Sequence, residues 1–362
     1  MFRFLKRLSA FWLGIQGGLT FLLIFGGGGY WLYQQYRMPA KPQAAQPASP
    51  STDPDSELPD LRLIRSPYIP DKLNFAGEPV PLYEDEVREK LERELLINLY
   101  WESHTSYIIK RSGRWFPLLE EVLRQEGIPD DFKYLAVAES ELDNATSPSG
   151  AKGFWQIMSF TAKEYGLEVS AQIDQRYDPI RSGQAACTYL KNAYQKFDNW
   201  TAAAASYNMG MGGLSRQMQT QRSTSYYDLV LNNETSRYIY RILAFKLIME
   251  YPERYHFDIP PEERYQNPPM RQLTIEKSIP DLVSYAHSQG TTYKTLRHYN
   301  PWIQGYSLSV LPGKTYTLQL PKDAPPPHGR RLFSSTGADS SRTAPADTTT
   351  SLTTDTTQPQ YP

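Results

Sequence analysis

The residue with the most informative chemistry in this sequence is Glu139, which lies in the run FKYLAVAESEL. The apolar residues of this run recur three or four positions apart, so a helix would place them on one arc with the carboxylate. They are Phe132, Leu135, Ala136 and Leu142. A carboxylic acid in apolar surroundings has a raised pKa and stays protonated near neutral pH, which suits a general acid. The run alone leaves a second interpretation open, in which the helix is tilted so that Glu139 meets solvent or a salt-bridge partner.

Three further motifs follow Glu139 along the chain. The run SPSGAKGFWQIM occupies residues 147–158, SYN occupies residues 206–208, and ETSRYI occupies residues 234–239. Taken singly, each motif is weak. The tyrosine of SYN could pack at a helix end and its asparagine could cap a helix C-terminus.

Together with the dipeptide Glu139–Ser140, these motifs resemble the lysozyme-like lytic transglycosylases of bacterial cell walls, specifically the membrane-bound lytic murein transglycosylase D group. That group carries ES, SPxGAxGxWQ, AYN and ETxxYV motifs in the same order. The lead-in GIPDDFKYLAVAES is also similar, and the resemblance extends over residues 116–251. Two positions depart from the family pattern, because Ser206 and Met209 stand where the family has alanine and serine.

The resemblance implies a role for each matched residue. Glu139 would be the catalytic acid, and the remaining matched residues would bind the sugar substrate. The residues that would line the sugar cleft are Ser147, Gly153, Gln156 and Met158. Those that would lie across from Glu139 or close the far wall are Tyr207, Asn208, Glu234 and Tyr238. Glu141 and Asp143 are rival carboxylates, which we expect to be solvated surface charges.

The implied reaction cleaves the β-1,4 bond between N-acetylmuramic acid and N-acetylglucosamine in peptidoglycan. Ordinary glycosidases need two carboxylates. In the resembled family a single glutamate protonates the leaving oxygen and then accepts the proton of the sugar's own 6-hydroxyl, which leaves a 1,6-anhydromuramyl end. Two alternatives remain open: a lysozyme-type hydrolase in which water attacks, and a non-catalytic scaffold that only binds peptidoglycan.

Composition narrows the function further. The net charge is −1 without a long basic block, which argues against a nucleic-acid partner. The single cysteine, Cys187, lies in a helical run and is expected to be a buried small residue; it allows neither an intrachain disulfide framework nor a multi-cysteine metal site. The five histidines form no HExxH pair, so we expect neither a metal site nor a cofactor. Protein partners are not predicted.

The N-terminal region predicts a membrane anchor. Residues 8–36 contain no charged side chain, and about 20 apolar residues suffice to cross a bilayer as a helix. Arg3, Lys6 and Arg7 precede this segment, which favours a cytoplasmic N-terminus and an exported remainder. We therefore expect an uncleaved signal anchor in the inner membrane of a bacterial cell envelope, with the catalytic domain in the periplasm.

The predicted fold is mainly α, with a goose-type lysozyme-like catalytic domain and a small βααβ module. Helices are expected from about residue 84, from Pro117, around Glu139, and at 161–165, 181–197, 201–207 and 236–251. The predicted divisions are 1–37 basic end and transmembrane anchor, 38–65 Pro/Ala-rich linker, 66–110 helical extension, 111–262 lytic transglycosylase domain, 270–321 LysM-like module and 322–362 disordered Ser/Thr/Pro tail.

The C-terminal module resembles a degenerate LysM unit, a peptidoglycan-binding βααβ fold. Alternating apolar residues near Leu273 and Leu318 predict one strand at each end, with two short helices between them. Asn300–Pro301 and the run LPGKTYTLQLP fit the second half of such a module. The opening GDT signature is replaced by residues 277–280, KSIP, which leaves glycan binding or a purely structural cap as alternatives.

Overall fold

The computed structural model describes residues 66–323. The predicted anchor 1–37, the linker 38–65 up to its last residue and all but the start of the tail 322–362 lie outside the described residues. Among residues 66–323 no helix has both the length and the apolar character that a bilayer span requires.

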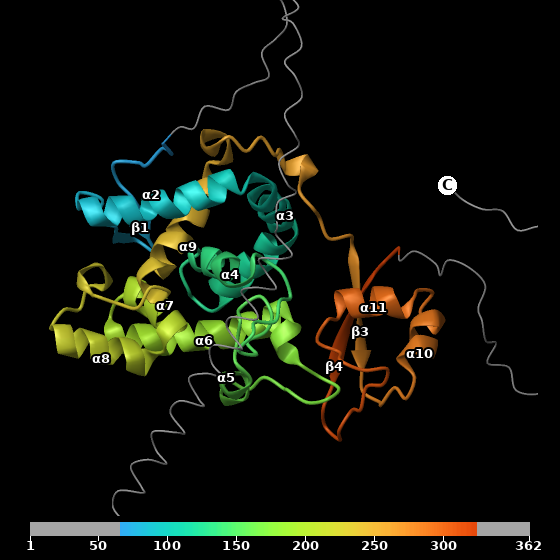
Figure 1. The fold of residues 1–362 in the computed structure, drawn as a ribbon. Coiled ribbons are helices and arrows are strands. Elements are labelled where there is room, and N and C mark those ends of the chain that lie inside the picture. The colour runs from blue at the N-terminus through green and yellow to red at the C-terminus, as the bar shows by residue number, and fades with distance from the viewer. Residues whose placement is uncertain (1–65, 324–362) are drawn as a thin grey trace, which may run out of the picture. The chain divides into compact units, whose positions relative to one another are not determined.

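The described chain is mainly α, as predicted (Figure 1). A short hairpin, β1 and β2, precedes the helices, and its bounds are Asn74–Phe75 and Glu78–Pro79. The helices of the larger body are α2 Asp85–Tyr100, α3 Glu102–Gln125, α4 Phe132–Ser140, α5 Ser159–Glu164, α6 Pro179–Phe197, α7 Trp200–Met209, α8 Met211–Gln221 and α9 Thr235–Glu250. Short 3-10 turns lie at Gln175–Tyr177, Tyr226–Asp228, Pro252–Tyr255 and Pro261–Glu263.

Helix α9 is the centre of this body and packs against α2, α4 and α7 (Figure 1). It is buried around most of its circumference, as expected of a helix with neighbours on several sides. Two polar contacts fix its position. Arg237 pairs with the buried Glu94 of α2 at 2.6 Å. Lys246 pairs with Asp131, which precedes α4, at 2.6 Å. Helix α4 therefore has a defined position relative to α9.

Helix α7 begins at a doubly capped N-terminus. The side chain of Asn199 accepts a hydrogen bond from the backbone of Ala202 at 2.7 Å. The carboxylate of Glu78, in the hairpin, accepts from the backbone N–H groups of Trp200 and Thr201 at 2.5 and 2.8 Å. The following run of alanines, residues 202–205, is fully buried, and such small side chains allow neighbouring helices to approach closely. The hairpin was not expected from the sequence, yet it helps to set the direction of α7.

The predicted helix start at Pro117 is wrong, because Pro117 lies inside the continuous helix α3. Proline in a helix interior removes one backbone hydrogen bond and crowds the preceding turn. Residues 265–267, outside this helix, bond to two other carbonyls of α3, on either side of the carbonyl of Gly113 that the proline leaves without its usual donor. The backbone of Tyr265 donates to the carbonyl of Lys110 at 2.8 Å, and the side chain of Asn267 donates to the carbonyl of Arg114 at 3.2 Å. The predicted domain boundary between residues 110 and 111 falls within the same helix.

The C-terminal module has the predicted strand–helix–helix–strand order. Its elements are β3 Met270–Ile275, α10 Leu282–Ser288, α11 Tyr293–Tyr299 and β4 Tyr316–Pro321, with β3 and β4 antiparallel. Fully buried Asn300 joins α11 to β4, because its side chain accepts from the backbone N–H of Gln319 and donates to the Gln319 carbonyl, both at 2.8 Å.

The segment between α5 and α6 connects the module to the helical body. Ile173 is buried in the hydrophobic core of the module and forms an isolated β-bridge with Ile303. The backbone of Asp174 donates to the carbonyl of Trp302, and Gln304 donates to that of Gln172, both at 2.8 Å.

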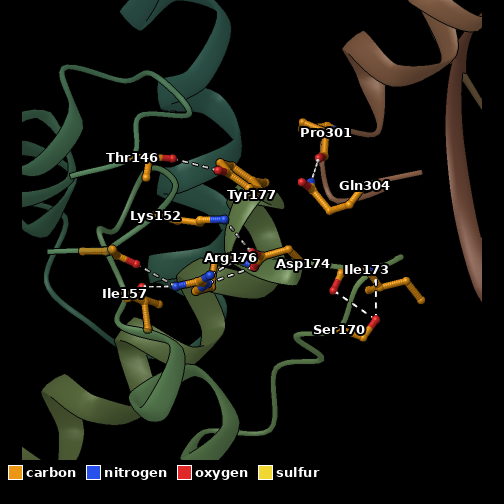
Figure 2. Close-up of polar contacts among 12 residues, drawn as sticks. Thr146, Lys152, Ile157, Ser170, Ile173, Asp174, Arg176, Tyr177, Pro301 and Gln304 are labelled. Carbon is orange, nitrogen blue, oxygen red and sulfur yellow. Dashed lines mark hydrogen bonds and ion pairs between the residues drawn. The ribbon is translucent and has the colours of Figure 1, made fainter. Parts of the chain in front are cut away.

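The side chain of Arg176 holds the loop that carries residues 147–158, and Figure 2 shows its contacts with Ile157 and Asp174. The buried guanidinium pairs with Asp174 at 2.8 Å and donates to the carbonyls of Gly150 and Ile157 at 3.0 and 3.2 Å. Gly153 has a φ of +79°, and a Cβ at this position would lie 1.8 Å from the carbonyl oxygen of Arg176. Only glycine fits this close approach between two backbone segments.

We expect Gly153→Ala to lower the free energy of unfolding by more than about 3 kcal/mol, because left-handed strain and a backbone clash add together. Gly150→Ala is the matched control, since Gly150 also has a positive φ, +87°, but has open space around the Cβ position. It should lower the free energy of unfolding by only about 1 kcal/mol. Chemical denaturation measures both variants, and equal losses would contradict the close-packing explanation.

Candidate active site

Helix α4 ends immediately after Glu139 in an unusual backbone turn. Glu141 and Leu142 both have positive φ angles, +55° and +57°, which non-glycine residues rarely adopt. Ion pairs and hydrogen bonds from α3 hold this turn. Arg111 donates to the carbonyl of Glu141 at 3.0 Å and pairs with Asp143 at 2.6 Å. His104 lies 3.0 Å from the Glu141 carboxylate. The rival carboxylates are therefore partly exposed, as expected, but each has a basic neighbour.

Glu139 is half-buried, and its carboxylate accepts a hydrogen bond from the hydroxyl of Tyr238 at 2.5 Å. Burial raises the pKa of Glu139 to about 7. The Tyr238 hydrogen bond and the positive charge of Arg241 lower the pKa, while the negative charge of Glu234 raises it. Desolvation outweighs these opposing interactions, so the group is partly protonated at neutral pH. The four apolar neighbours expected from the helical spacing, Phe132, Leu135, Ala136 and Leu142, are all fully buried.

Tyr207 reaches the same place from the end of α7, and Asn208 follows it in the same helix, next to the start of α9. The negative charge of Glu139 is the second cause, after burial, of the raised pKa of Tyr207. The Tyr207 hydroxyl donates to the carbonyl of Trp155 at 2.8 Å, which ties α7 to the loop. The side-chain oxygen of Asn208 accepts from the hydroxyl of Thr235, the first residue of α9, at 2.7 Å. Three helix segments, α4, α7 and α9, thus converge around one carboxylate.

The loop residues of the predicted site lie in a tightly bonded turn. Ser147 closes this turn, because its hydroxyl accepts from the backbone of Ala151 at 3.0 Å. Gln156 has a strained φ of +44°, and its side-chain amide donates to the carbonyls of Ala145 and Gly153 at 3.1 and 2.8 Å. Gln156 therefore stabilises the loop through the side chain that was expected to line the sugar cleft. Met158 lies at the loop's end and is 43% exposed.

The two matched residues of α9 differ in their surroundings. Tyr238 is fully buried and contacts Glu139 directly. Glu234 is exposed and pairs with Arg241 at 3.2 Å. The structure thus brings Glu139, Tyr207 and Tyr238 together, while Glu234 acts on Glu139 through its charge.

Sequence reasoning missed Arg241, Trp155 and Arg176. Arg241 lies three residues after Tyr238 and seven after Glu234, so helical periodicity could have placed it on the same face of α9. Trp155 is fully buried and carries the carbonyl that Tyr207 contacts, a backbone role that leaves no sequence signal. Arg176 binds loop carbonyls that are distant in the sequence.

Within residues 66–323, no group of three or more histidine, cysteine or acidic side chains is placed to hold a metal ion. Cys187 is buried, as predicted, and burial raises the pKa of its thiol to about 12.

Residues 119–230 match the family model of the transglycosylase SLT domain. Residues 271–324 match the soluble lytic transglycosylase C-terminal LysM-like domain. The chain contains an SLT domain followed by a LysM-like domain. The SLT match includes Glu139, the loop 147–158 and the Tyr207–Asn208 pair, and it ends before Glu234. These two domain matches, together with the relatives described next, confirm the predicted resemblance to lytic murein transglycosylases.

Two relatives are the membrane-bound lytic murein transglycosylase D proteins of Escherichia coli strains K12 and O6:H1. Each is 26% identical over 246 residues, which cover 66% of this chain and 53% of the relative. The chain therefore spans about half the length of these curated relatives. Among solved structures, the 70 kDa soluble lytic transglycosylase of Escherichia coli matches with a TM-score of 0.33 and 23% identity, covering 42% of this chain and 26% of that one. The goose-type lysozyme-like fold stays a prediction.

The raised pKa of Glu139 makes a prediction for stability. The folded state binds the proton more tightly than the unfolded chain, so the contribution of Glu139 is most favourable below the unfolded pKa of about 4.3. It is lost as the pH rises through the folded value of about 7. We expect Glu139→Gln to increase the free energy of unfolding by about 2 kcal/mol at pH 8, allowing for residual solvent contact, and by almost nothing at pH 4. Urea denaturation at the two pH values measures this difference. A pH-independent effect would exclude the proposed titration.

Proposed function

We propose that this protein is a peptidoglycan lytic transglycosylase in which Glu139 is the single acid and base. The observation that carries the proposal is a glutamate with a pKa of about 7 where α4, α7 and α9 converge, inside an SLT domain. The names of the relatives support the same substrate class. A pKa near the working pH is optimal for a group that first donates a proton and then accepts one.

In the first step, protonated Glu139 donates its proton to the oxygen that leaves N-acetylmuramic acid. Positive charge develops at the anomeric carbon, and the oxygen of the muramyl N-acetyl group can support it. The Thr235 hydroxyl holds the oxygen end of the Asn208 amide, which leaves the NH₂ end to donate toward the substrate. A donor fixed in this way stabilises charge that develops in the transition state.

In the second step, the ionised Glu139 accepts the proton of the 6-hydroxyl on the same sugar. The 6-oxygen attacks the anomeric carbon, whose bond to the leaving oxygen broke in the first step, and the product is a 1,6-anhydromuramyl end. No water is consumed; the donated proton stays on the leaving hydroxyl, and the glutamate is reprotonated by the 6-hydroxyl. An internal nucleophile has a large effective molarity relative to water, so a second protein carboxylate is not needed.

The surroundings of Glu234 favour this mechanism over hydrolysis. Hydrolysis by two carboxylates requires the second to act as a base or a nucleophile near the sugar. Glu234 is exposed and its carboxylate is paired with Arg241 at 3.2 Å, so it is held in a surface ion pair and is not free to act as that base or nucleophile.

The module and the N-terminal region complete the proposal. The LysM-like domain is the second glycan-binding unit of the protein, and peptidoglycan strands are its partner.

The chain is anchored in the inner membrane of a bacterial envelope through the segment within residues 1–37, with the SLT domain in the periplasm. The positive residues before the apolar run and the membrane-bound relatives support this location.

Digestion of peptidoglycan by the full-length protein tests the reaction itself. We expect mass spectrometry to find products that end in 1,6-anhydromuramic acid, and Glu139→Gln to reduce their rate by at least about 10³-fold. Glu141→Gln is the control, because that carboxylate contacts His104 instead of the site, and it should retain most activity. Reducing-end products would favour the hydrolase, and binding without products would favour the scaffold.

The pH profile tests the role of Tyr238. Since the acid must be protonated in the free enzyme, kcat/KM should fall about tenfold per pH unit above about pH 7. The Tyr238 hydrogen bond lowers the pKa of Glu139, so Tyr238→Phe should move the alkaline limb to higher pH. Tyr240→Phe serves as the matched control, since Tyr240 is a buried tyrosine of the same helix that packs on Tyr226 and Tyr227 instead. A limb that moves to lower pH in Tyr238→Phe would contradict the assignment.

A further inference from the structure

A cavity of about 450 Å³ lies between the SLT domain and the LysM-like module. Helix α3 and the turn after α4 form one side, and α11 of the module forms the other. The turn contributes Leu142 and Asn144, only three and five residues after Glu139. Consecutive Cα atoms are about 3.8 Å apart, so the Cα of Leu142 is within about 11 Å of that of Glu139. A ligand in this cavity would lie close to the proposed site of cleavage.

Positive charge in this cavity exceeds negative charge. Of its three arginines, Arg111 is neutralised by Asp143 at 2.6 Å. Arg114 and Arg297 have no carboxylate partner within residues 66–323. Their guanidinium groups lie over tyrosine rings instead, that of Arg114 at 5.7 Å from the Tyr265 ring centroid. Two uncompensated arginines in one cavity favour an anionic ligand, and a planar carboxylate suits the geometry of a guanidinium.

The neighbouring His298 responds to the same charge. Burial lowers its pKa, and the positive charges of Arg114 and Lys294 lower it further. His298 is therefore neutral at pH 7, which leaves the two arginines as the cationic groups that a ligand would meet.

Three buried polar atoms at this place have no hydrogen-bond partner in the described chain: Nε of Arg114, Nε of Arg297 and Oδ1 of Asn144. Buried polar atoms are nearly always bonded, so a group of three around one cavity is unusual. Two of the atoms are donors and one is an acceptor. A ligand that satisfies all three presents an acceptor such as a carboxylate together with an N–H donor.

This combination of groups favours a peptide over an inorganic anion. An inorganic phosphate has acceptors for the arginines and an O–H donor for Asn144, but it has no apolar part to contact the aromatic wall of the cavity. A peptide with a free carboxylate supplies both groups. Trp115 and Phe154, packed edge to face at 4.7 Å, add an apolar wall for an aliphatic side chain.

We propose that this cavity binds the carboxylate-bearing peptide carried by a peptidoglycan glycan strand, with Arg114 and Arg297 as ligands for the carboxylate and Asn144 as the acceptor for an amide N–H. The inference rests on the proposed function, since it assigns a second part of the same substrate to a second site. The module contributes Arg297, so the cavity has both arginines only when the LysM-like module is docked on the SLT domain.

A binding experiment tests this assignment without turnover. The probe is a disaccharide dipeptide, N-acetylglucosaminyl-N-acetylmuramyl-L-Ala-D-Glu, compared with the same compound with its carboxylates amidated. Calorimetry on the full-length Glu139→Gln protein should show that the free-acid probe binds at least about tenfold more tightly, because hydrogen bonds to charged groups are the stronger ones. Adding Arg114→Gln or Arg297→Gln should abolish most of this preference.

Three controls separate charge recognition from a general effect on folding. Arg88→Gln removes an exposed arginine of α2 outside the cavity and should leave the preference unchanged. Arg297→Lys keeps the charge and should preserve a large part of the preference. Unfolding temperatures of all variants should stay within a few degrees of the parent protein.

The outcomes separate this inference from the function on which it rests. Equal affinity for the free and amidated probes, or a preference that both arginine variants keep, would overturn the peptide site while leaving anhydro product formation intact. Absence of anhydro products from the unmodified protein would overturn the function, even where the carboxylate preference persists. Tight binding of inorganic phosphate that competes with the probe would show an unspecific anion site and would also overturn the peptide assignment.

Discussion

The buried ion pair between Arg176 and Asp174 is the interaction on which the arrangement of the site depends. Both side chains are 4% exposed. Such a pair is favourable only when its remaining donors and acceptors are satisfied, and here they are used to hold the structure together. Arg176 donates to two carbonyls of the loop 147–158, while the backbone of Asp174 donates to Trp302 in the module. One short segment therefore fixes the loop on one side and the LysM-like module on the other.

The proposed acid depends on a balance that the surrounding helices set. Burial alone would raise the pKa of Glu139 further, whereas Tyr238 and Arg241 counteract that rise. The result near 7 requires α4 to bury the carboxylate and α9 to supply both partners. The ion pairs Glu94–Arg237 and Asp131–Lys246 hold α9 against its neighbours, so they position the site without touching it. The destabilisation of ionised Glu139 is the cost of this arrangement.

The sequence predicted those features that local patterns encode. Apolar residues three and four apart revealed α4 and the surroundings of Glu139, and alternating residues revealed β3 and β4. Helix α8 was missed because its start, MGG, has a low helix propensity, and because Leu214 is its only buried residue, which leaves little apolar periodicity in its sequence. Pro117 was taken for a helix start because proline is common in the first turn of a helix, whereas the bonds that α3 accepts near it come from residues 265–267, far along the chain. The catalytic and binding roles of the matched residues stay predictions.

Long-range features were not accessible from the sequence for a related reason. Gln156 was expected to meet substrate, but the need to bond two carbonyls of a strained loop decides where its amide points. Arg114 and Arg297 belong to different domains, and neither has a local pattern that indicates a shared cavity. Only the docked module brings their charges together.

A glycan-binding module joined by a flexible linker would raise the local concentration of a glycan strand, but it would not determine which sugar of the strand lies beside Glu139. Here the module is docked through backbone hydrogen bonds from Asp174 and Gln304 and through the contact of Glu168 with Lys314 at 3.0 Å. In the proposed mechanism, a docked module would keep a set distance to Glu139, so any group that it binds would define which glycosidic bond reaches the proposed acid. Under the proposed function, docking would therefore make the module part of the specificity of the site, because an internal reaction requires the reacting atoms to be held in one geometry.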